Sequence, residues 1–257
     1  MLELHDVSKV YNAGTVREMS LFDGFSLQVP TGQFVSIVGS NGSGKTSLLN
    51  LICGSIPPDA GSILLDGKDI TKMPEHRRLR HIGRIHQNPA MGTCASMTIL
   101  ENLSLADHKF SRMNLMPGTD RRRIPKYREM LSGLGLGLEN MLSARAGSLS
   151  GGQRQALAMV MSLMTPIDFL ILDEHTAALD PKTSDTIMEL TGRFVRENNL
   201  TALMVTHNLR YAIQYGDRLL MLHQGNVVLD KEGGEKQTTR LEDVLGLFTQ
   251  ISIELGN

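Results

Sequence analysis

The sequence predicts an α/β fold organised around a glycine-rich loop at residues 39–46. Three observations support this prediction. Continuous apolar runs of strand length lie at residues 34–38, 168–173 and 200–206, and such runs are typical of strands buried on both faces of a parallel sheet. Stretches with helical spacing of apolar residues separate them. With 257 residues, the chain is long enough for one large α/β domain that carries a helical insertion.

The composition narrows the class of protein. Hydrophobic residues make up 41% and charged residues 21%, as in an ordinary soluble protein. A net charge of −1 argues against a generally basic nucleic-acid binder. Cys53 and Cys94 are too few and too far apart for a disulfide framework or a zinc site, so two reduced thiols are expected. Neither a signal peptide nor an apolar run of 18 residues is visible, so we expect any membrane role to require a partner.

The N-terminal third predicts a β-rich part that leads into the glycine loop. Alternation and turn residues mark its elements, and Asp66-Gly67 is a strong hairpin signal. The expected elements are a strand at 2–10, a polar loop or hairpin at 12–24, a strand at 25–29, a turn at 30–32, a strand at 34–38, a helix after the glycine loop ending before Gly54, and a hairpin-like piece at 62–67.

The remainder of the chain predicts a helical segment followed by further strands and helices. Glycines at 133, 135 and 137 interrupt the helical segment. The expected elements are a short strand within 81–89, helices from 97 to 163 that include a basic run at 121–128 and a new helix from Ser150, a strand at 168–173, a helix at 181–197, a strand at 200–206, a helix near 208–215, strands near 218–223 and 226–230, and a tail at 231–257 with an amphipathic piece at 241–253.

The glycine loop itself predicts a nucleoside triphosphate site. Residues 39–46 read Gly-Ser-Asn-Gly-Ser-Gly-Lys-Thr and match the phosphate-binding pattern G-x4-G-K-[ST]. Glycines let the backbone N–H groups approach an anion closely, and the start of the following helix faces it. Lys45 supplies a positive charge, and the Thr46 hydroxyl is an oxygen ligand of the kind that Mg²⁺ takes. A ligand-free strand–helix turn is the alternative, but the Lys-Thr pair disfavours it.

Two further motifs lie downstream. Ser150-Gly151-Gly152-Gln153 opens a helix, where a hydroxyl and free N–H groups can cradle another anion or simply cap the helix. Asp173 and Glu174 follow a buried strand, at the kind of strand end where α/β sheets gather ligands. The simpler alternative for this pair is two solvated loop carboxylates.

Taken in order, these motifs resemble those of the ATP-binding-cassette (ABC) family, the nucleotide-binding subunits of ABC transporters. The resemblance covers about residues 3–230. It implies a P-loop NTPase of RecA-like core, with an N-terminal antiparallel β-subdomain and a helical signature-motif subdomain. Within a single ABC ATPase domain at 1–257, it places the core and β-subdomain at about 1–87 and 165–230, the helical subdomain at 88–164 and a C-terminal tail at 231–257.

The resemblance also implies a role for each motif residue. Residues 39–46 become the Walker A loop, residues 149–153 the signature motif, residues 169–173 Walker B, and residues 178–180 the D-loop. The implied catalytic residues are Glu174, His207, Gln87 and Lys45. The implied ligands of Mg²⁺ are Thr46, Gln87 and Asp173. The implied ATP-binding residues are Tyr11, Gly39, Ser40, Asn41, Gly42, Ser43, Gly44, Lys45, Thr46, Ser150, Gly151, Gly152 and Gln153.

Each of these roles has a chemical rationale beside a simpler alternative. Tyr11 offers an aromatic face to stack on adenine, or is a half-buried core residue. Glu174 can orient or deprotonate the attacking water. His207 can contact the γ-phosphate, or is structural. Positioning and charge neutralisation are what phosphoryl transfer requires.

Two residues depart from the commonest family pattern, and two segments go beyond it. His175 stands where a proline often follows the glutamate, and Ala177 replaces a frequent serine. Neither position is expected to touch the reacting atoms. Residues 12–24 are longer than a minimal cassette needs, and the basic run at 121–128 is most simply a solvated or docking helix face.

The resemblance implies an ATPase coupled to transport. One loop and one signature per chain imply a homodimer, or a pair with a similar subunit, that closes head-to-tail on ATP. The expected partners are an integral-membrane permease, docked around residues 88–104, and a solute-binding protein, with no nucleic acid. The expected location is the cytoplasmic face of the membrane, held there through the permease. An importer of a small solute such as an amino acid is favoured; an exporter or a lipid- or lipoprotein-extracting system is the alternative, and a soluble non-transport ATPase is the third.

Overall fold

The computed structural model describes residues 1–109 and 118–254, the last four of these by their backbone alone. Two sheets form its framework. A four-stranded antiparallel sheet, in the order β2-β1-β4-β5, contains β1 (Leu2–Tyr11), β2 (Met19–Val29), β4 (Ala60–Leu65) and β5 (Lys68–Asp69). A six-stranded sheet, in the order β10-β9-β3-β8-β7-β6, contains β3 (Phe34–Gly39), β6 (Ile82–Ile85), β7 (Phe169–Asp173), β8 (Thr201–Val205), β9 (Arg218–His223) and β10 (Asn226–Glu232).

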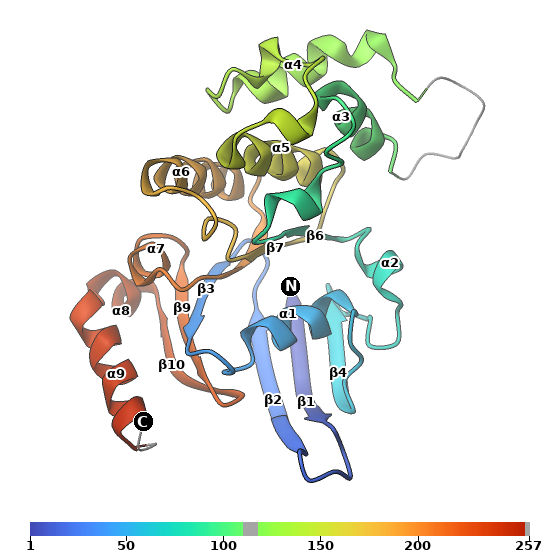
Figure 1. Cartoon of the computed structure of the whole chain (residues 1–257). Helices are drawn as coiled ribbons and strands as arrows, with labels where there is room; N and C mark the ends of the chain where they lie inside the picture. The colour runs from blue at the N-terminus through green and yellow to red at the C-terminus, as the bar shows by residue number, and fades with distance from the viewer. Residues whose placement is uncertain (110–117, 255–257) are drawn as a thin grey trace.

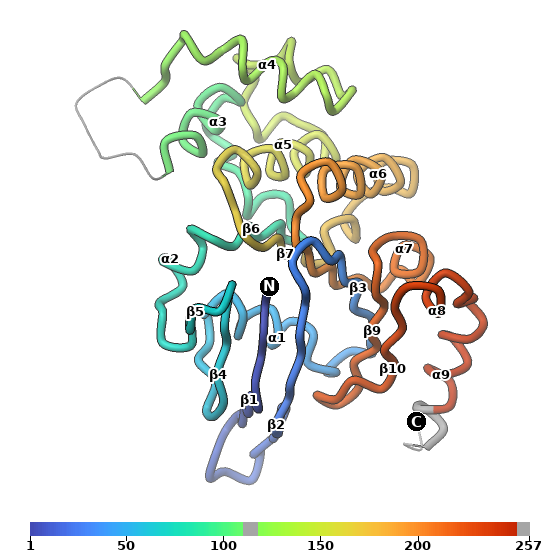
Figure 2. The backbone as a smooth tube through the Cα atoms, turned by 180° about the vertical axis from the view of Figure 1, so that it is seen from behind, coloured from blue at the N-terminus to red at the C-terminus, as the bar shows by residue number. Residues whose placement is uncertain are grey.

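Helices pack against both faces of the six-stranded sheet. Figures 1 and 2 show α3, α4 and α5 at one end of the molecule and the antiparallel sheet at the other. The α-helices are α1 (Lys45–Cys53), α2 (Glu75–Arg78), α3 (Ile99–Asp107), α4 (Ile124–Ser132), α5 (Gly151–Leu163), α6 (Pro181–Glu197), α7 (Leu209–Gln214), α8 (Gly233–Thr238) and α9 (Leu241–Glu254). Short 3₁₀ turns lie at Pro89–Gly92, Arg121–Arg123, Leu138–Asn140 and Ala146–Ser148.

The register of the larger sheet brings the predicted motifs to one edge. β3 pairs in parallel with β8 and β9, β8 pairs with β7, and β7 pairs with β6. Because parallel strands point the same way, their carboxyl ends lie together. The glycine loop after β3, the acidic pair at the end of β7 and His207 after β8 therefore share one edge.

Two main cores hold this arrangement. The first lies between the two sheets around α1, in which Leu48, Leu49, Leu51 and Ile52 have no exposed surface. The second joins the opposite face of the larger sheet to α3, α4, α5 and α6. A smaller cluster joins α7 and α9 to β9. Helix α1 is thus fixed from both sides, so the loop at its start has a rigid base.

The predicted elements exist, with differences at several boundaries. β2 begins at Met19, six residues before the predicted strand at 25–29, and only residues 12–18 form the connecting turn. The reason is pairing with β1, which reaches Tyr11↔Met19 through a series of bulges. Cross-strand partners thus override a locally polar sequence.

Two further boundaries differ. The basic run at 121–128 is a 3₁₀ turn followed by α4, with Pro125 in the first turn of that helix. The tail contains α8 as well as the predicted 241–253 helix, which extends to Glu254. Part of the predicted helical segment, residues 110–117, lies outside the described residues, as do the side chains after residue 250.

Cys53 is buried in α1 and Cys94 is exposed, both as free thiols. Across residues 1–109 and 118–254, no helix is both long and apolar enough to cross a membrane.

Candidate nucleotide site

The glycine loop turns from β3 into α1 over five residues. Gly44 caps α1 in a left-handed conformation, with φ at 105°, where a side chain would strain the backbone. A Cβ on Gly39 would lie 2.3 Å from the carbonyl oxygen of Leu222 on the neighbouring strand. Close strand packing and the turn therefore both require glycine. The result is a helix N-terminus whose N–H groups are open to an anion.

Lys45 lies over this loop and is only 6% exposed. Its ammonium donates hydrogen bonds to the carbonyl oxygens of Gly39 at 2.7 Å and Ser40 at 2.8 Å. Burial lowers the pKa of Lys45, and the charge of Glu174 opposes that shift. A positive charge held at the loop by its own backbone is suited to meet phosphate oxygens.

A cavity of about 200 Å³ opens over the loop. Residues 41–47 form its floor, and Glu174 and His207 line one side. Met19 and Leu21, at the start of β2, also line the cavity. Sequence reasoning missed these two residues because it placed them in a loop. The structure thus gives the 12–24 segment a role, since its second half forms part of the site wall.

The acidic pair ends β7 in an unusual backbone conformation. Glu174 has φ at +46°, which costs a non-glycine residue about 1–3 kcal/mol. Its N–H donates to the carbonyl oxygen of Val205 at 2.9 Å, which ties it to β8. Its Oε1 lies 2.6 Å from Nε2 of His207. The predicted catalytic glutamate and switch histidine therefore meet at the rim of the cavity.

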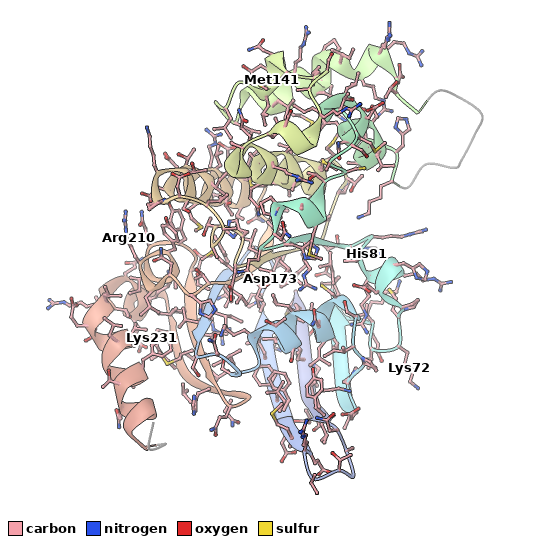
Figure 3. All side chains as sticks on the ribbon, viewed as in Figure 1. Lys72, His81, Met141, Asp173, Arg210 and Lys231 are labelled. Carbon is pink, nitrogen blue, oxygen red and sulfur yellow. The ribbon has the colours of Figure 1, made fainter. Side chains whose placement is uncertain are left out.

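Asp173 is engaged by an arginine that sequence reasoning did not single out. Arg84 on β6 donates from Nη2 to Oδ2 of Asp173 at 2.7 Å and from Nη1 to Oδ1 of Asn50 at 3.0 Å. Figure 3 places Asp173 in the middle of the molecule, where the two sheets and the helices meet. A charged residue within the apolar strand Ile82–Ile85 is the one sequence signal that could have drawn attention to Arg84.

The oxygen donors of the site fit Mg²⁺. In the described residues, no group of three or more His, Cys, Asp or Glu side chains could hold a metal by itself. Mg²⁺ is commonly bound by one or two carboxylates together with substrate phosphates and water. Asp173 supplies such a carboxylate, and Thr46 is exposed beside the cavity floor. Gln87 is also exposed, two residues after β6 ends, and does not line the cavity.

Tyr11 ends β1 beside the loop helix. Its hydroxyl donates to Oγ of Ser47 at 3.1 Å, and Ser47 lines the cavity. The ammonium of Lys9 lies 5.9 Å from the ring centroid. The ring is partly exposed and borders the first core. The structure thus places this aromatic side chain next to the glycine loop.

The signature residues lie apart from the loop of the same chain. Ser150 and Gln153 cap the start of α5 reciprocally. The N–H of Gln153 donates to Oγ of Ser150 at 3.3 Å, and the N–H of Ser150 donates to Oε1 of Gln153 at 3.2 Å. Gly152 is buried, and a Cβ there would lie 2.1 Å from Thr183 of α6. None of these residues lines the cavity over the glycine loop, and α5 starts in a different part of the molecule from α1 (Figure 1). Ser150 is exposed.

The two departures from the family pattern fall next to the site. His175 is 2% exposed, its Nε2 lies 3.2 Å from Oγ1 of Thr191 on α6, and burial lowers its pKa to about 4. Ala177 is exposed and, with Glu174 and His207, lines a second cavity of about 490 Å³ that extends along the D-loop toward α7.

Comparison with known proteins gives the family. The family model described as "ABC transporter" matches residues 22–177. The chain is 46% identical to the tyrosine transport ATP-binding protein of Clostridioides difficile (strain R20291), over 96% of this chain and 98% of that protein. It is 34% identical to the phosphonates import ATP-binding protein PhnC of Alcaligenes faecalis, over 96% of this chain and 88% of that protein.

Solved structures agree in fold. The dimeric post-hydrolysis state of the ATP-binding cassette MJ0796, bound to ADP and Pi, matches with a TM-score of 0.75 and 30% identity, over 90% of this chain and 98% of that chain. A nucleotide-free cassette from an ABC transporter matches with a TM-score of 0.79 and 25% identity, over 100% and 99% of the two chains. Family match, relatives and the glycine loop agree, and this chain belongs to the ABC transporter family as an ATP-binding subunit that hydrolyses ATP.

Proposed function

We propose that two copies of this chain close head-to-tail around ATP, so that the signature of one copy completes the site on the loop of the other. The observation that carries this proposal is the separation of Ser150–Gln153 from the cavity over residues 41–47. A capped helix start with an exposed serine can cradle phosphate, yet within one chain it lies apart from the cavity over the glycine loop. The dimeric cassette with ADP and Pi is a precedent from a similar protein.

Within each composite site, the roles follow the geometry. The loop N–H groups and Lys45 bind the β- and γ-phosphates, and Tyr11 stacks on adenine. Thr46 and Asp173 would hold Mg²⁺, and Gln87 would join them when the site closes. Mg²⁺ neutralises charge that develops on the phosphates. Glu174 accepts a proton from the attacking water, with His207 positioned between that carboxylate and the γ-phosphate.

Mixing two inactive variants tests the head-to-tail dimer. Lys45→Ala damages the loop and Ser150→Ala damages the signature, so each homodimer has two broken sites. In a mixed dimer, one site joins the intact loop of the Ser150→Ala chain to the intact signature of the Lys45→Ala chain. Random pairing of two such chains restores about a quarter of the wild-type ATPase activity.

The controls separate pairing in trans from pairing in cis. If each chain used its own signature, the mixture would stay as inactive as either variant, and the dimer proposal would fail. Ser148→Ala is the matched control, because Ser148 is also exposed but donates to the carbonyl oxygen of Arg145 instead of capping α5. This variant is expected to keep wild-type activity alone and in mixtures.

We further infer that the chain powers import of a small solute, such as an amino acid, through a separate permease. The tyrosine transport protein of C. difficile and the phosphonate, spermidine/putrescine and methionine import proteins are among its relatives. The helical subdomain, about 88–164, is proposed to dock on the permease at the cytoplasmic face. Met91, 68% exposed just after Gln87, and Leu105, 58% exposed on α3, supply apolar contacts there.

Reconstitution with the permease in proteoliposomes tests this direction. For an importer, ATP enclosed with the cassette drives uptake of labelled amino acid, and an external solute-binding protein stimulates hydrolysis. Stimulation by a lipid or solute supplied on the ATP side would favour the export or extraction alternative. A soluble role in translation or DNA repair would leave ATPase activity unaffected by any permease; no nucleic-acid partner is proposed.

A further inference from the structure

Arg84 forms a bridge between β7 and α1, the two elements that carry the proposed Mg²⁺ ligands Asp173 and Thr46. Its guanidinium donates to Asp173 at the end of β7 and to Asn50 on α1 through separate nitrogens, at 2.7 and 3.0 Å. The side chains of Arg84 and Asp173 are only 12% and 16% exposed. A rigid planar fork of this kind fixes orientation better than a point charge does.

The anchor on α1 has a specific position. Asn50 follows Thr46 by four residues in the same helix, so the two side chains lie one above the other on one helix face. Arg84 therefore contacts Asp173 directly and, through Asn50, contacts α1 one helical turn after Thr46. Through these two contacts, the guanidinium sets the spacing between a carboxylate from the sheet and a hydroxyl from the loop helix.

The contribution of Arg84 to the stability of the fold does not explain why an arginine is present at this position. The Nε of Arg84 is buried without a nitrogen or oxygen hydrogen-bond partner among the described residues, and the neighbouring Cys53 sulfur is only a weak acceptor. An unsatisfied buried donor costs about 1–3 kcal/mol, and a buried ion pair replaced by well-packed apolar residues often leaves a protein as stable or more so. The neighbouring positions Ile82 and Ile85 are apolar and buried. An arginine between them therefore indicates a task at the site.

We propose that Arg84 is a positioning residue for the Mg²⁺ site: it binds one oxygen of Asp173 and ties that carboxylate to α1, which leaves the second oxygen oriented toward the ion held by Thr46. This inference rests on the proposed roles of Asp173 and Thr46. Groups that orient metal ligands are worth about 10–100-fold in metal affinity or activity.

The test measures the gain in nucleotide affinity that Mg²⁺ provides. Binding of a fluorescent, non-hydrolysable ATP analogue is titrated in Mg²⁺ and again in EDTA, for the wild type and for Arg84→Met. We expect the Mg²⁺-dependent gain to fall about tenfold in Arg84→Met, while affinity in EDTA stays at the wild-type value because the loop and Lys45 are intact.

Further variants separate the bridge from charge and from folding. Arg84→Lys keeps the charge but replaces the planar fork, whose separate nitrogens hold Asp173 and Asn50, with a single ammonium that lacks this fixed geometry. It is therefore expected to resemble Arg84→Met. Asn50→Ala leaves the ion pair intact but unties it from α1, and is expected to lower the gain less, in the same direction. Arg218→Met is the matched control, since Arg218 forms a two-bond pair with Asp230 between β9 and β10 and should leave the gain unchanged.

The possible results distinguish failure of the inference about Arg84 from failure of the proposed Mg²⁺ site. A wild-type-like or larger gain in Arg84→Met would overturn the inference, the larger gain indicating that the guanidinium competes with the ion. A full gain in Arg84→Lys would overturn the bridging argument. If the wild type showed no Mg²⁺-dependent gain and Asp173→Asn changed nothing, the proposed metal site itself would be wrong. Thermal denaturation without nucleotide confirms that each variant is folded.

Discussion

Replacing Glu174 by glutamine tests the proposed chemistry most directly. Glutamine has the same size, and its carbonyl oxygen can still accept from Nε2 of His207, which lies 2.6 Å from the native carboxylate. The backbone at φ +46° is fixed by the bond to Val205 and is unaffected. The substitution therefore removes proton acceptance and little else. ATP binding depends on the loop and should be retained.

The expected loss follows from that single missing function. A positioned general base contributes about 10²–10⁴-fold in rate, or roughly 3–5 kcal/mol of activation free energy. The folded state should lose less than about 1 kcal/mol, because the partner His207 is half-exposed and such pairs contribute little. ATP that binds and is not hydrolysed holds the closed state, so dimers should accumulate.

Single-turnover phosphate release and size-exclusion chromatography with Mg²⁺ and ATP measure both effects. Glu189→Gln is the control, because it removes one negative charge at an exposed position of α6. This variant should hydrolyse ATP at the wild-type rate and should not accumulate as a dimer. A loss below about tenfold for Glu174→Gln would refute the assignment of this carboxylate as the base. So would a full loss accompanied by failure to bind ATP.

Three other perturbations probe the frame of the site. Burial raises the pKa of Cys53 to about 11, so thiol reagents at pH 8 should label Cys94 and spare Cys53 until unfolding. Because only the unfolded Cys53 thiol ionises between pH about 8.5 and 11, the free energy of unfolding of the wild type should fall across that window relative to that of Cys53→Ser measured at the same pH. Arg78 is 2% exposed and donates to four backbone carbonyl oxygens around the end of α1. Changing it to Met should therefore lower the free energy of unfolding, measured by urea denaturation, by about 3 kcal/mol or more. Gly152→Ala should destabilise the α5–α6 contact, and adding Thr183→Ser should restore part of the melting temperature, because the clashing atom is the threonine methyl.

Local chemistry predicted a large part of this site. The glycine loop was recognisable because its glycines, lysine and threonine lie within eight positions and match the phosphate-binding pattern. Asp173 and Glu174 were recognisable because they follow an apolar strand. In contrast, Arg84 contacts Asp173 across 89 positions of sequence, and Met19 reaches the cavity only because β2 pairs with β1. No local pattern encodes such partners.

By itself, the sequence determined the family, the phosphate loop and the identity of the ionisable groups, since these depend on residue types at fixed short spacings. Tertiary structure decided which groups share a site. Parallel pairing of β3, β8 and β7 brings the loop, His207 and Glu174 to one edge, whereas α5 begins elsewhere and leaves Ser150 outside the cavity. The physical reason is that strand register and helix packing are fixed by contacts between distant residues, which no single stretch of the chain contains.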